Sequence, residues 1–163
     1  MKTYYIFRHG QTFATTKNSG YGLQRLTAGI LESGKPTIIK MAEFLKDVPT
    51  DLNLTSPILR CRQTAEIITL ETGKKFMADW RITEMMEPFQ ILKWRVKNLL
   101  NQLEKSDFNT ILICTHGAVI EGLVSYLMRG NFKVQDVMAY PPPPPGILIK
   151  IEDGKIEEWD FNQ

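Results

Sequence analysis

The chain has 163 residues and a nearly balanced charge, with 20 lysine and arginine side chains against 18 aspartate and glutamate side chains. Hydrophobic residues make up 43% and charged residues 23%, which excludes a disordered chain and predicts a globular protein. No apolar stretch is long enough to span a membrane, there is no signal-peptide pattern, and the charge indicates neither a nucleic-acid nor a membrane partner. Two cysteines, Cys61 and Cys114, are too few for a disulfide framework, so we expect a cytoplasmic protein in which both are small buried side chains.

The first third of the chain predicts one strand, a long loop and a helix. Residues 3–7 are mainly β-favouring, which indicates a strand. The polar stretch over 11–32 is typical of a loop. Ser33 is expected to cap the next helix, whose apolar positions recur at helical spacing as far as Val48.

Two further strand–helix units follow. Residues 51–55 predict a strand, and Ser56 as cap with Pro57 at the first helical position predicts a helix. After a short strand over 75–78, apolar residues at helical spacing predict a long helix over 88–103.

The last third combines a buried strand, a helix and a hairpin. Residues 111–114 are uniformly apolar, as in strands buried on both faces of a parallel sheet, and 119–127 predict a helix. Residues 147–159 alternate around Asp153-Gly154, which is a two-residue hairpin signal. The elements together predict the α/β class: one domain over 1–163, a three-layer α/β/α sandwich whose mostly parallel sheet carries an antiparallel C-terminal hairpin.

One low-complexity segment interrupts this pattern, the five prolines from Pro141 to Pro145. A run without backbone N–H donors predicts polyproline II conformation. It is either a stiff connection from the last helix to the hairpin or a ligand for an aromatic groove on another protein.

Polar residues follow three of the predicted strands at the points where these strands end. Arg8 and His9 follow the first strand, Ser56 the second, and His116 comes after the apolar strand; His9 and His116 are the only histidines, and each precedes a glycine. The carboxyl ends of parallel strands share one edge of a sheet, so these side chains should converge with Arg60 in the first turn of its helix. Arginines, histidines and a helix N-terminus suit the charged oxygens of a phosphoryl group. The sequence therefore predicts a phosphate pocket, and it contains no ligand pattern for a metal or a cofactor.

Three segments resemble the motifs of the histidine phosphatase superfamily, the phosphoglycerate mutase-like proteins. Residues 8–12 are similar to its RHG(E/Q)T motif, and residues 56–65 to its SPxxRAxQTA motif with Cys61 in the usual alanine place. Residues 115–117 match its closing THG, and 34–45 resemble its first helix. The motifs occur in the family's order and span most of the chain, so the resemblance is specific and implies the family's α/β fold.

The resemblance implies a role for each matched residue. His9 would be the nucleophile that forms a phosphohistidine, while Arg8, Arg60 and His116 would hold the transferring phosphoryl group. The second arginine of that motif, Arg62, is expected to face outward. Four further residues in or near the motifs would border the substrate: Gly10, Gln11, Thr15 and Gly117. Of these, Thr15 stands where the family often has asparagine.

The resemblance also implies a general acid, which protonates the leaving group. Residues 81–84 are similar to the family's RLxE segment, which nominates Glu84. Glu87 is the alternative, because residues 85–89 replace the glycine and WEG that usually follow in the family. The loop over 13–32 and the region 84–98 are expected to form the walls of the substrate pocket. The candidate residues are Tyr21, Arg25, Met85, Phe89 and Trp94.

The activity implied is that of a metal-independent phosphatase acting on a small phosphomonoester. A phosphoglycerate mutase-type transfer is an alternative, although the chain is short and lacks the mutase pattern near Glu84. A protein phosphohistidine phosphatase is another, and such enzymes typically lack the acid. A binding module that retains the pocket without turnover is the last alternative. The physiological substrate and the oligomeric state stay open.

Overall fold

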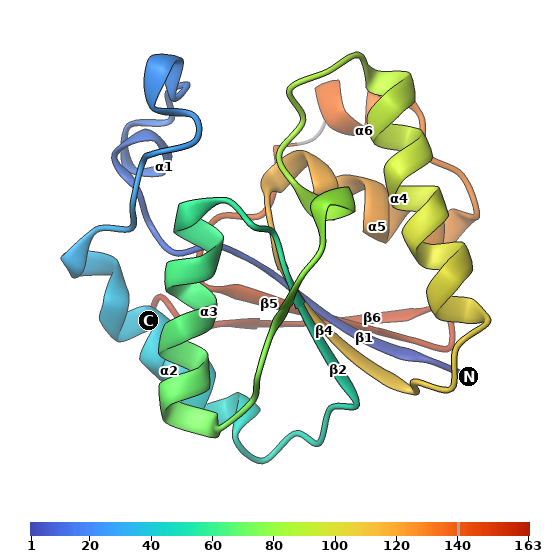
Figure 1. Cartoon of the computed structure of the whole chain (residues 1–163), viewed down its shortest axis with the longest axis horizontal. Helices are drawn as coiled ribbons and strands as arrows, with labels where there is room; N and C mark the ends of the chain where they lie inside the picture. Colours follow the sequence, from blue (N-terminus) through green and yellow to red (C-terminus); the bar gives the residue numbers. More distant parts are fainter. Residues whose placement is uncertain (140) are drawn as a thin grey trace.

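The computed structural model describes residues 1–139 and 141–163 and has a central sheet with helices on both faces (Figure 1). Six strands are hydrogen-bonded in the order β3-β2-β4-β1-β5-β6. Their bounds are β1 (Thr3–Arg8), β2 (Leu52–Thr55), β3 (Met77–Ala78), β4 (Thr110–Thr115), β5 (Ile147–Glu152) and β6 (Lys155–Asp160). The first four are parallel, and the β5–β6 hairpin joins β1 in antiparallel pairing. This arrangement confirms the predicted three-layer α/β architecture.

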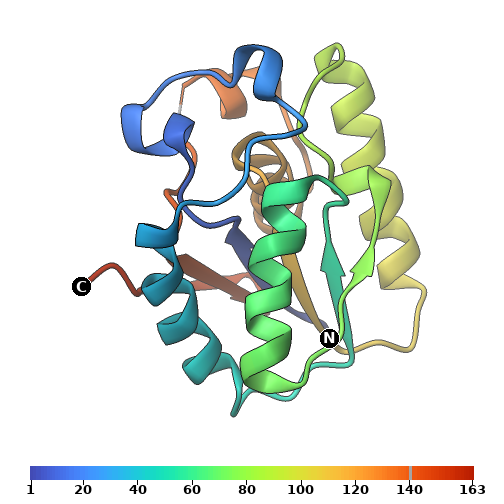
Figure 2. The same cartoon turned by 60° about the vertical axis from the view of Figure 1, so that its left-hand side comes forward.

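Four helices form the two outer layers (Figures 1 and 2). On one face α2 (Lys35–Leu45) packs beside α3 (Leu59–Thr72), and on the other α4 (Phe89–Glu104) packs beside α5 (Gly117–Arg129). The short helices α1 (Phe13–Lys17) and α6 (Val134–Met138) lie at the upper end of the molecule in Figure 1. In the described residues, no helix is both long and apolar enough to cross a membrane.

Alternate residues of the central strands supply the two cores, since successive side chains of a strand point to opposite faces. Ile6 and Ile113 pack into the core beneath α4 and α5. Phe7 and Cys114 pack into the core beneath α2 and α3. Because both faces are covered, the central strands are apolar at almost every position, as the run over 111–114 indicated.

The prediction that Ser33 caps a helix ending near Val48 is wrong at both ends. Ser33 lies inside a 3-10 turn, η2 (Glu32–Gly34), and Gly34 is the N-cap of α2. The chain is therefore already helical at Ser33, and its hydroxyl does not precede the helix. The α-helix ends at Leu45, because Pro49 disfavours helical geometry in the residue before it and the intervening residues form turns.

The predicted start of α3 is also wrong, by two residues. The N-cap is Ile58 in extended conformation, so neither Ser56 as cap nor Pro57 as first helical residue is correct. The Ser56 hydroxyl accepts from the Ile58 N–H at 3.2 Å and lies 2.8 Å from His116 Nε2. Ser56 therefore connects the end of β2 to the histidine that follows β4.

The loop over 11–32 contains more structure than its composition indicated. It includes α1 and a 3-10 turn, η1 (Gly22–Gln24). Thr12 caps α1 by accepting from the Thr15 N–H, and the Thr15 hydroxyl accepts from the Thr12 N–H at 2.8 Å. This reciprocal capping stabilises a helix of one turn within a polar segment.

The C-terminal hairpin is confirmed at the predicted turn. Asp153 and Gly154 have positive φ angles of 51° and 68°, as a two-residue hairpin turn matched to strand twist requires. The hairpin extends the sheet beyond β1 on the side away from β2.

Candidate active site

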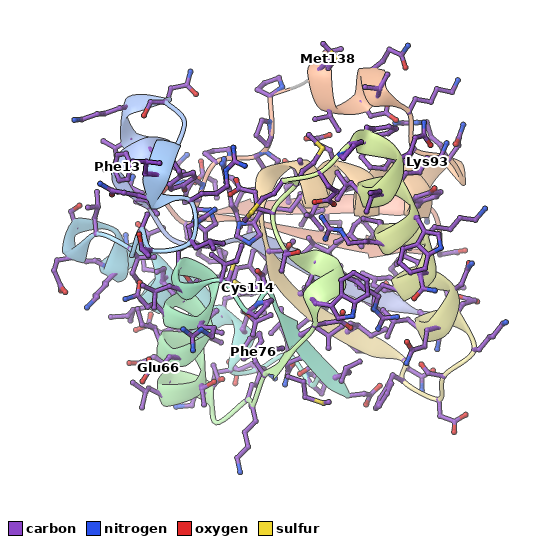
Figure 3. The ribbon with its side chains drawn as sticks, turned by 45° about the horizontal axis from the view of Figure 1, so that its top comes forward. Phe13, Glu66, Phe76, Lys93, Cys114 and Met138 are labelled. Carbon is purple, nitrogen blue, oxygen red and sulfur yellow. The ribbon has the colours of Figure 1, made fainter. Side chains whose placement is uncertain are left out.

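The predicted residues converge where three neighbouring strands end. Two backbone hydrogen bonds join these ends: His9 N–H to the Thr115 carbonyl at 3.1 Å, and Ser56 N–H to the Cys114 carbonyl at 3.0 Å. The ring centroids of His9 and His116 are 5.4 Å apart. Figure 3 shows Cys114, the penultimate residue of β4, near the middle of the molecule, with Phe13 towards the upper left and Met138 at the top. The sheet edge therefore brings together side chains that are about 100 positions apart in sequence.

The hydrogen bonds of His9 define which of its ring nitrogens is free. Nδ1 lies 2.8 Å from the Gly10 carbonyl, and since a carbonyl only accepts, Nδ1 carries the proton. Nε2 is then unprotonated and accepts from the Arg60 Nε–H at 3.3 Å. His9 therefore presents a lone pair at Nε2, beside a guanidinium group.

The environment keeps His9 neutral. Burial, with the side chain 1% exposed, lowers its pKa to about 3. The charges of Arg8 and Arg60 act in the same direction, whereas the hydrogen bond to Gly10 opposes them. A neutral imidazole is the form that can act as a nucleophile.

Arg60 is fully buried and has several partners within the chain. It pairs with Glu84, donates through Nη1 to the Arg25 carbonyl at 2.6 Å, and lies with Cζ 4.0 Å from the centre of the Tyr21 ring. Glu84 therefore balances the charge of Arg60 within the chain.

Arg8 is the cation that lacks such a partner. Its Nε is buried without a hydrogen-bond partner among the described residues, and its Nη1 reaches only the Pro143 carbonyl, at 3.4 Å. Burial lowers the pKa of Arg8, whereas the charges of Tyr21 and Glu84 oppose this effect and that of Arg60 adds to it. A buried guanidinium with free donor capacity favours an incoming anion.

His116 also has an unused nitrogen. It is the N-cap of α5, with Nε2 held by the Ser56 hydroxyl at 2.8 Å and 3.5 Å from the sulfur of Cys61. Its Nδ1 is buried and has no partner among residues 1–139 and 141–163. Burial holds its pKa well below the usual value, and the charges of His9 and Arg60 contribute. The site therefore contains two buried nitrogens, on Arg8 and His116, that an oxygen ligand would satisfy.

Glu84 and Glu87 have different partners. Glu84 pairs with Arg60, next to His9, and its side chain is 24% exposed. Glu87 pairs with Arg95 of α4, whose Nη2 lies 2.6 Å from its carboxylate. The geometry thus places Glu84 at the site and Glu87 in a contact that holds the loop.

Arg95 is a residue that the sequence reasoning missed. It is 3% exposed and donates to the carbonyls of Arg81 at 2.8 Å and Thr83 at 3.0 Å. Arg95 therefore fixes the segment that carries Glu84. The available signal was its position three residues after Leu92, which places an arginine on the apolar stripe of the helix.

Of the four residues predicted to border the substrate, two make contacts within the fold and two lie near Arg8. A Cβ at Gly10 would lie 2.5 Å from the Ile38 side chain, so this glycine permits the packing of α2. Gln11 accepts at its carbonyl from the Leu31 N–H at 2.7 Å, which is a contact within the loop. Thr15 lines a small cavity beside Arg8, and Gly117 lies against Pro142 and Arg8.

The candidate wall residues also separate into two groups. Tyr21 and Arg25 contact Arg60, as described above. Phe89 packs against Phe132 with ring centroids 4.9 Å apart, and Met85 is partly buried against the same core. Trp94 is 56% exposed. Arg62 is exposed, as expected.

The buried histidines predict an acid-sensitive fold. An unfolded histidine has a pKa of about 6.5, whereas His9 has a pKa of about 3 in the folded chain. Between these values the unfolded state binds more protons, so the free energy of unfolding should fall as the pH is lowered from 6.5 towards 3. Each such histidine contributes at most about 1.4 kcal/mol per pH unit.

Urea unfolding at several pH values between 7.5 and 4.5 measures this dependence. In the His9→Gln variant the free energy of unfolding should depend less steeply on pH, by the uptake of about one proton on unfolding. Glutamine does not titrate, whereas the contribution of His116 remains. An identical pH dependence for the wild type and this variant would contradict the assigned state of His9.

Comparisons with known proteins agree with this geometry. The profile of the histidine phosphatase superfamily (branch 1) matches residues 4–87, which is just over half of the chain. No curated protein sequence matches at a significant level.

Solved structures share the fold over nearly the whole chain at low sequence identity. An Escherichia coli protein described as an α-ribazole-5′-phosphate phosphatase has a TM-score of 0.80 and 18% identity, with 100% of this chain and 98% of that chain covered. The α-ribazole phosphatase of Shigella flexneri has a TM-score of 0.77 and 18% identity, covering 99% and 96%. The mycobacterial glucosyl-3-phosphoglycerate phosphatase in complex with VO3 has a TM-score of 0.75 and 17% identity, covering 98% and 97%.

Proposed function

The chain belongs to the histidine phosphatase superfamily, and on that premise we propose that it is a phosphatase that hydrolyses a small phosphomonoester through a phosphohistidine on His9. The observation that carries this proposal is the unprotonated Nε2 of His9, which lies beside the buried guanidinium of Arg60. Structural neighbours that are described as phosphatases add support.

In the first step, His9 Nε2 attacks the phosphorus atom and the bond from phosphorus to the ester oxygen breaks. The substrate phosphate replaces Glu84 on Arg60. The freed carboxylate then lies beside a second anion and takes up a proton from solvent. Glu84 then gives its proton to the leaving oxygen, so that an alcohol departs instead of an alkoxide. The Gly10 carbonyl, which accepts from the Nδ1–H of His9, stabilises the positive charge that the ring acquires.

In the second step, a water molecule replaces the alcohol. The Glu84 carboxylate takes a proton from this water as its oxygen attacks phosphorus, and the P–N bond to His9 breaks. Inorganic phosphate leaves and His9 returns to the neutral form. Glu84 gives the proton that it took from the water back to solvent when its carboxylate pairs with Arg60 again. Two displacements at one phosphorus thus replace a single attack by water.

Side chains supply the charge stabilisation in this mechanism. Arg8, Arg60 and the Nδ1 of His116 surround the position of the transferring group and donate to its oxygens. We propose that this set makes the reaction metal-independent and that residues 1–163 act as one domain, in the cytoplasm, on a small phosphorylated substrate.

Phosphate release tests this function. With p-nitrophenyl phosphate and with 3-phosphoglycerate, in buffer containing a chelator, we expect free phosphate and no 2-phosphoglycerate. Isomer without free phosphate would instead identify a mutase. Loss of activity in chelator that a divalent ion restores would contradict metal independence, and no release from any ester would contradict the phosphatase.

A further inference from the structure

The five prolines from 141 to 145, here called the proline strap, lie against the site. A Cβ on Gly117, the first residue of α5, would be 2.6 Å from Pro142 Cβ. Arg8 Nη1 donates to the Pro143 carbonyl at 3.4 Å. The strap therefore packs on the residues that surround the phosphoryl position, and the absence of a side chain at Gly117 permits this contact.

A cavity of about 180 Å³ lies between the proline strap and the loop that contains α1. Arg8 and Tyr21 form part of its wall, and the Tyr21 ring also lies against Arg60. The Glu84 carboxylate pairs with the same Arg60 guanidinium that lies over the Tyr21 ring. The cavity therefore adjoins the two arginines that are proposed to hold the phosphoryl group, directly at Arg8 and through the Tyr21 ring at Arg60.

The lining of the cavity is almost uncharged. Arg8 is its only cation and no acidic side chain contributes, among the residues that the structure describes. The remaining polar groups are those of Thr15, Asn18, Ser19 and Tyr21, and four prolines of the strap supply an apolar wall. Since Arg8 is engaged by the phosphoryl group, a second anion in the cavity would lose its hydration without gaining a cation.

We propose that this cavity selects phosphomonoesters whose leaving group is small, uncharged and hydroxylated, and that it discriminates against leaving groups with a carboxylate or a second phosphate. The hydroxyl groups of a polyol or sugar can hydrogen-bond to the polar side chains of the loop that contains α1, and its carbon skeleton can pack on the proline strap. The volume is below the roughly 300 Å³ at which pockets for drug-sized ligands begin, which favours a small leaving group. This inference rests on the proposed function and specifies its substrate class.

Two substrates of equal size test the charge selection. Glycerol 3-phosphate and 3-phosphoglycerate differ in one group, a hydroxymethyl in the first and a carboxylate in the second. We expect kcat/KM to be at least about 10-fold higher for glycerol 3-phosphate, because only the carboxylate must be desolvated without a partner. Equal values, or a preference for 3-phosphoglycerate, would overturn the proposal.

A charge placed in the cavity should change this preference. Ser19 is exposed at the cavity wall, and Ser19→Lys is expected to reduce the ratio of the two kcat/KM values by at least about 10-fold. Ser33→Lys is the matched control, since it adds the same charge at an exposed residue of η2 outside the cavity lining. The same change of ratio in both variants, or in neither, would show that the cavity is not the cause.

Binding to the His9→Ala variant separates this inference from the proposed function. Calorimetry should show tighter binding of glycerol 3-phosphate than of 3-phosphoglycerate. If it does while the wild type hydrolyses no ester, the proposed phosphatase activity is wrong and the proposed selectivity of the cavity is supported. Equal binding of the two compounds, or binding of neither, contradicts the proposed selectivity of the cavity even if the wild type is an active phosphatase.

Discussion

Replacing His9 with alanine is expected to lower kcat/KM for a phosphomonoester by about 10⁴-fold or more, the scale on which loss of a nucleophile acts. The variant removes the Nε2 lone pair that lies beside Arg60. His116 cannot substitute for it, because its Nε2 accepts from the Ser56 hydroxyl and its Nδ1 then carries the proton, so that neither nitrogen offers a free lone pair. Initial rates of phosphate release from p-nitrophenyl phosphate measure the effect.

A second variant separates loss of the nucleophile from loss of packing. His9→Gln retains a polar side chain that can accept from the Arg60 Nε–H, but it offers no nucleophilic nitrogen. It should lose as much activity as His9→Ala while unfolding cooperatively in urea. Activity within about 10-fold of wild type in either folded variant would rule out His9 as the nucleophile.

Replacing Glu84 with glutamine is expected to slow hydrolysis of an alkyl phosphate by about 10²–10⁴-fold, the usual range for the contribution of a general acid. Hydrolysis of p-nitrophenyl phosphate should change far less, because nitrophenolate leaves without a proton. The ratio of the two kcat/KM values is the measurement, since it cancels any common effect on phosphate binding or on the pairing with Arg60.

Glu87→Gln is the matched control for this prediction. Glu87 lies three residues along the same loop but pairs with Arg95, so its loss should affect both substrates to a similar extent. If Glu87→Gln shows the dependence on leaving group and Glu84→Gln does not, the acid is Glu87. Equal slowing of both substrates in Glu84→Gln excludes Glu84 from proton transfer.

Much of the fold was predictable because its signals are local. Apolar runs and helical spacing located the strands and helices, and Asp153-Gly154 located the hairpin turn. The errors occurred at helix starts, where tertiary contacts decide the boundary. Ser56 has the sequence of a cap, but its hydroxyl lies 2.8 Å from His116, which comes 60 residues later.

The site was predictable to the extent that strand ends and motifs define it. His9, His116, Arg8 and Arg60 converge because β1, β4 and β2 are neighbours in the sheet. The contacts that shape the pocket were not predictable, since they join residues distant in sequence.

The proline strap shows this most clearly. Its composition indicated a stiff segment, but only the structure brings Pro142 against Gly117 and Pro143 to Arg8. Arg95 is a similar case, because its partners lie on a loop whose path does not follow from a local pattern.

The central claim is that a phosphoryl group becomes bound to His9 Nε2, and trapping of the phosphoenzyme tests it most directly. The protein is mixed with a ³²P-labelled phosphomonoester, quenched in denaturant within the first turnover and digested. We predict an acid-labile, alkali-stable label on the peptide that contains His9, and no label in His9→Ala. A wild type that releases phosphate without forming this label, or an equal label in His9→Ala, would contradict the account.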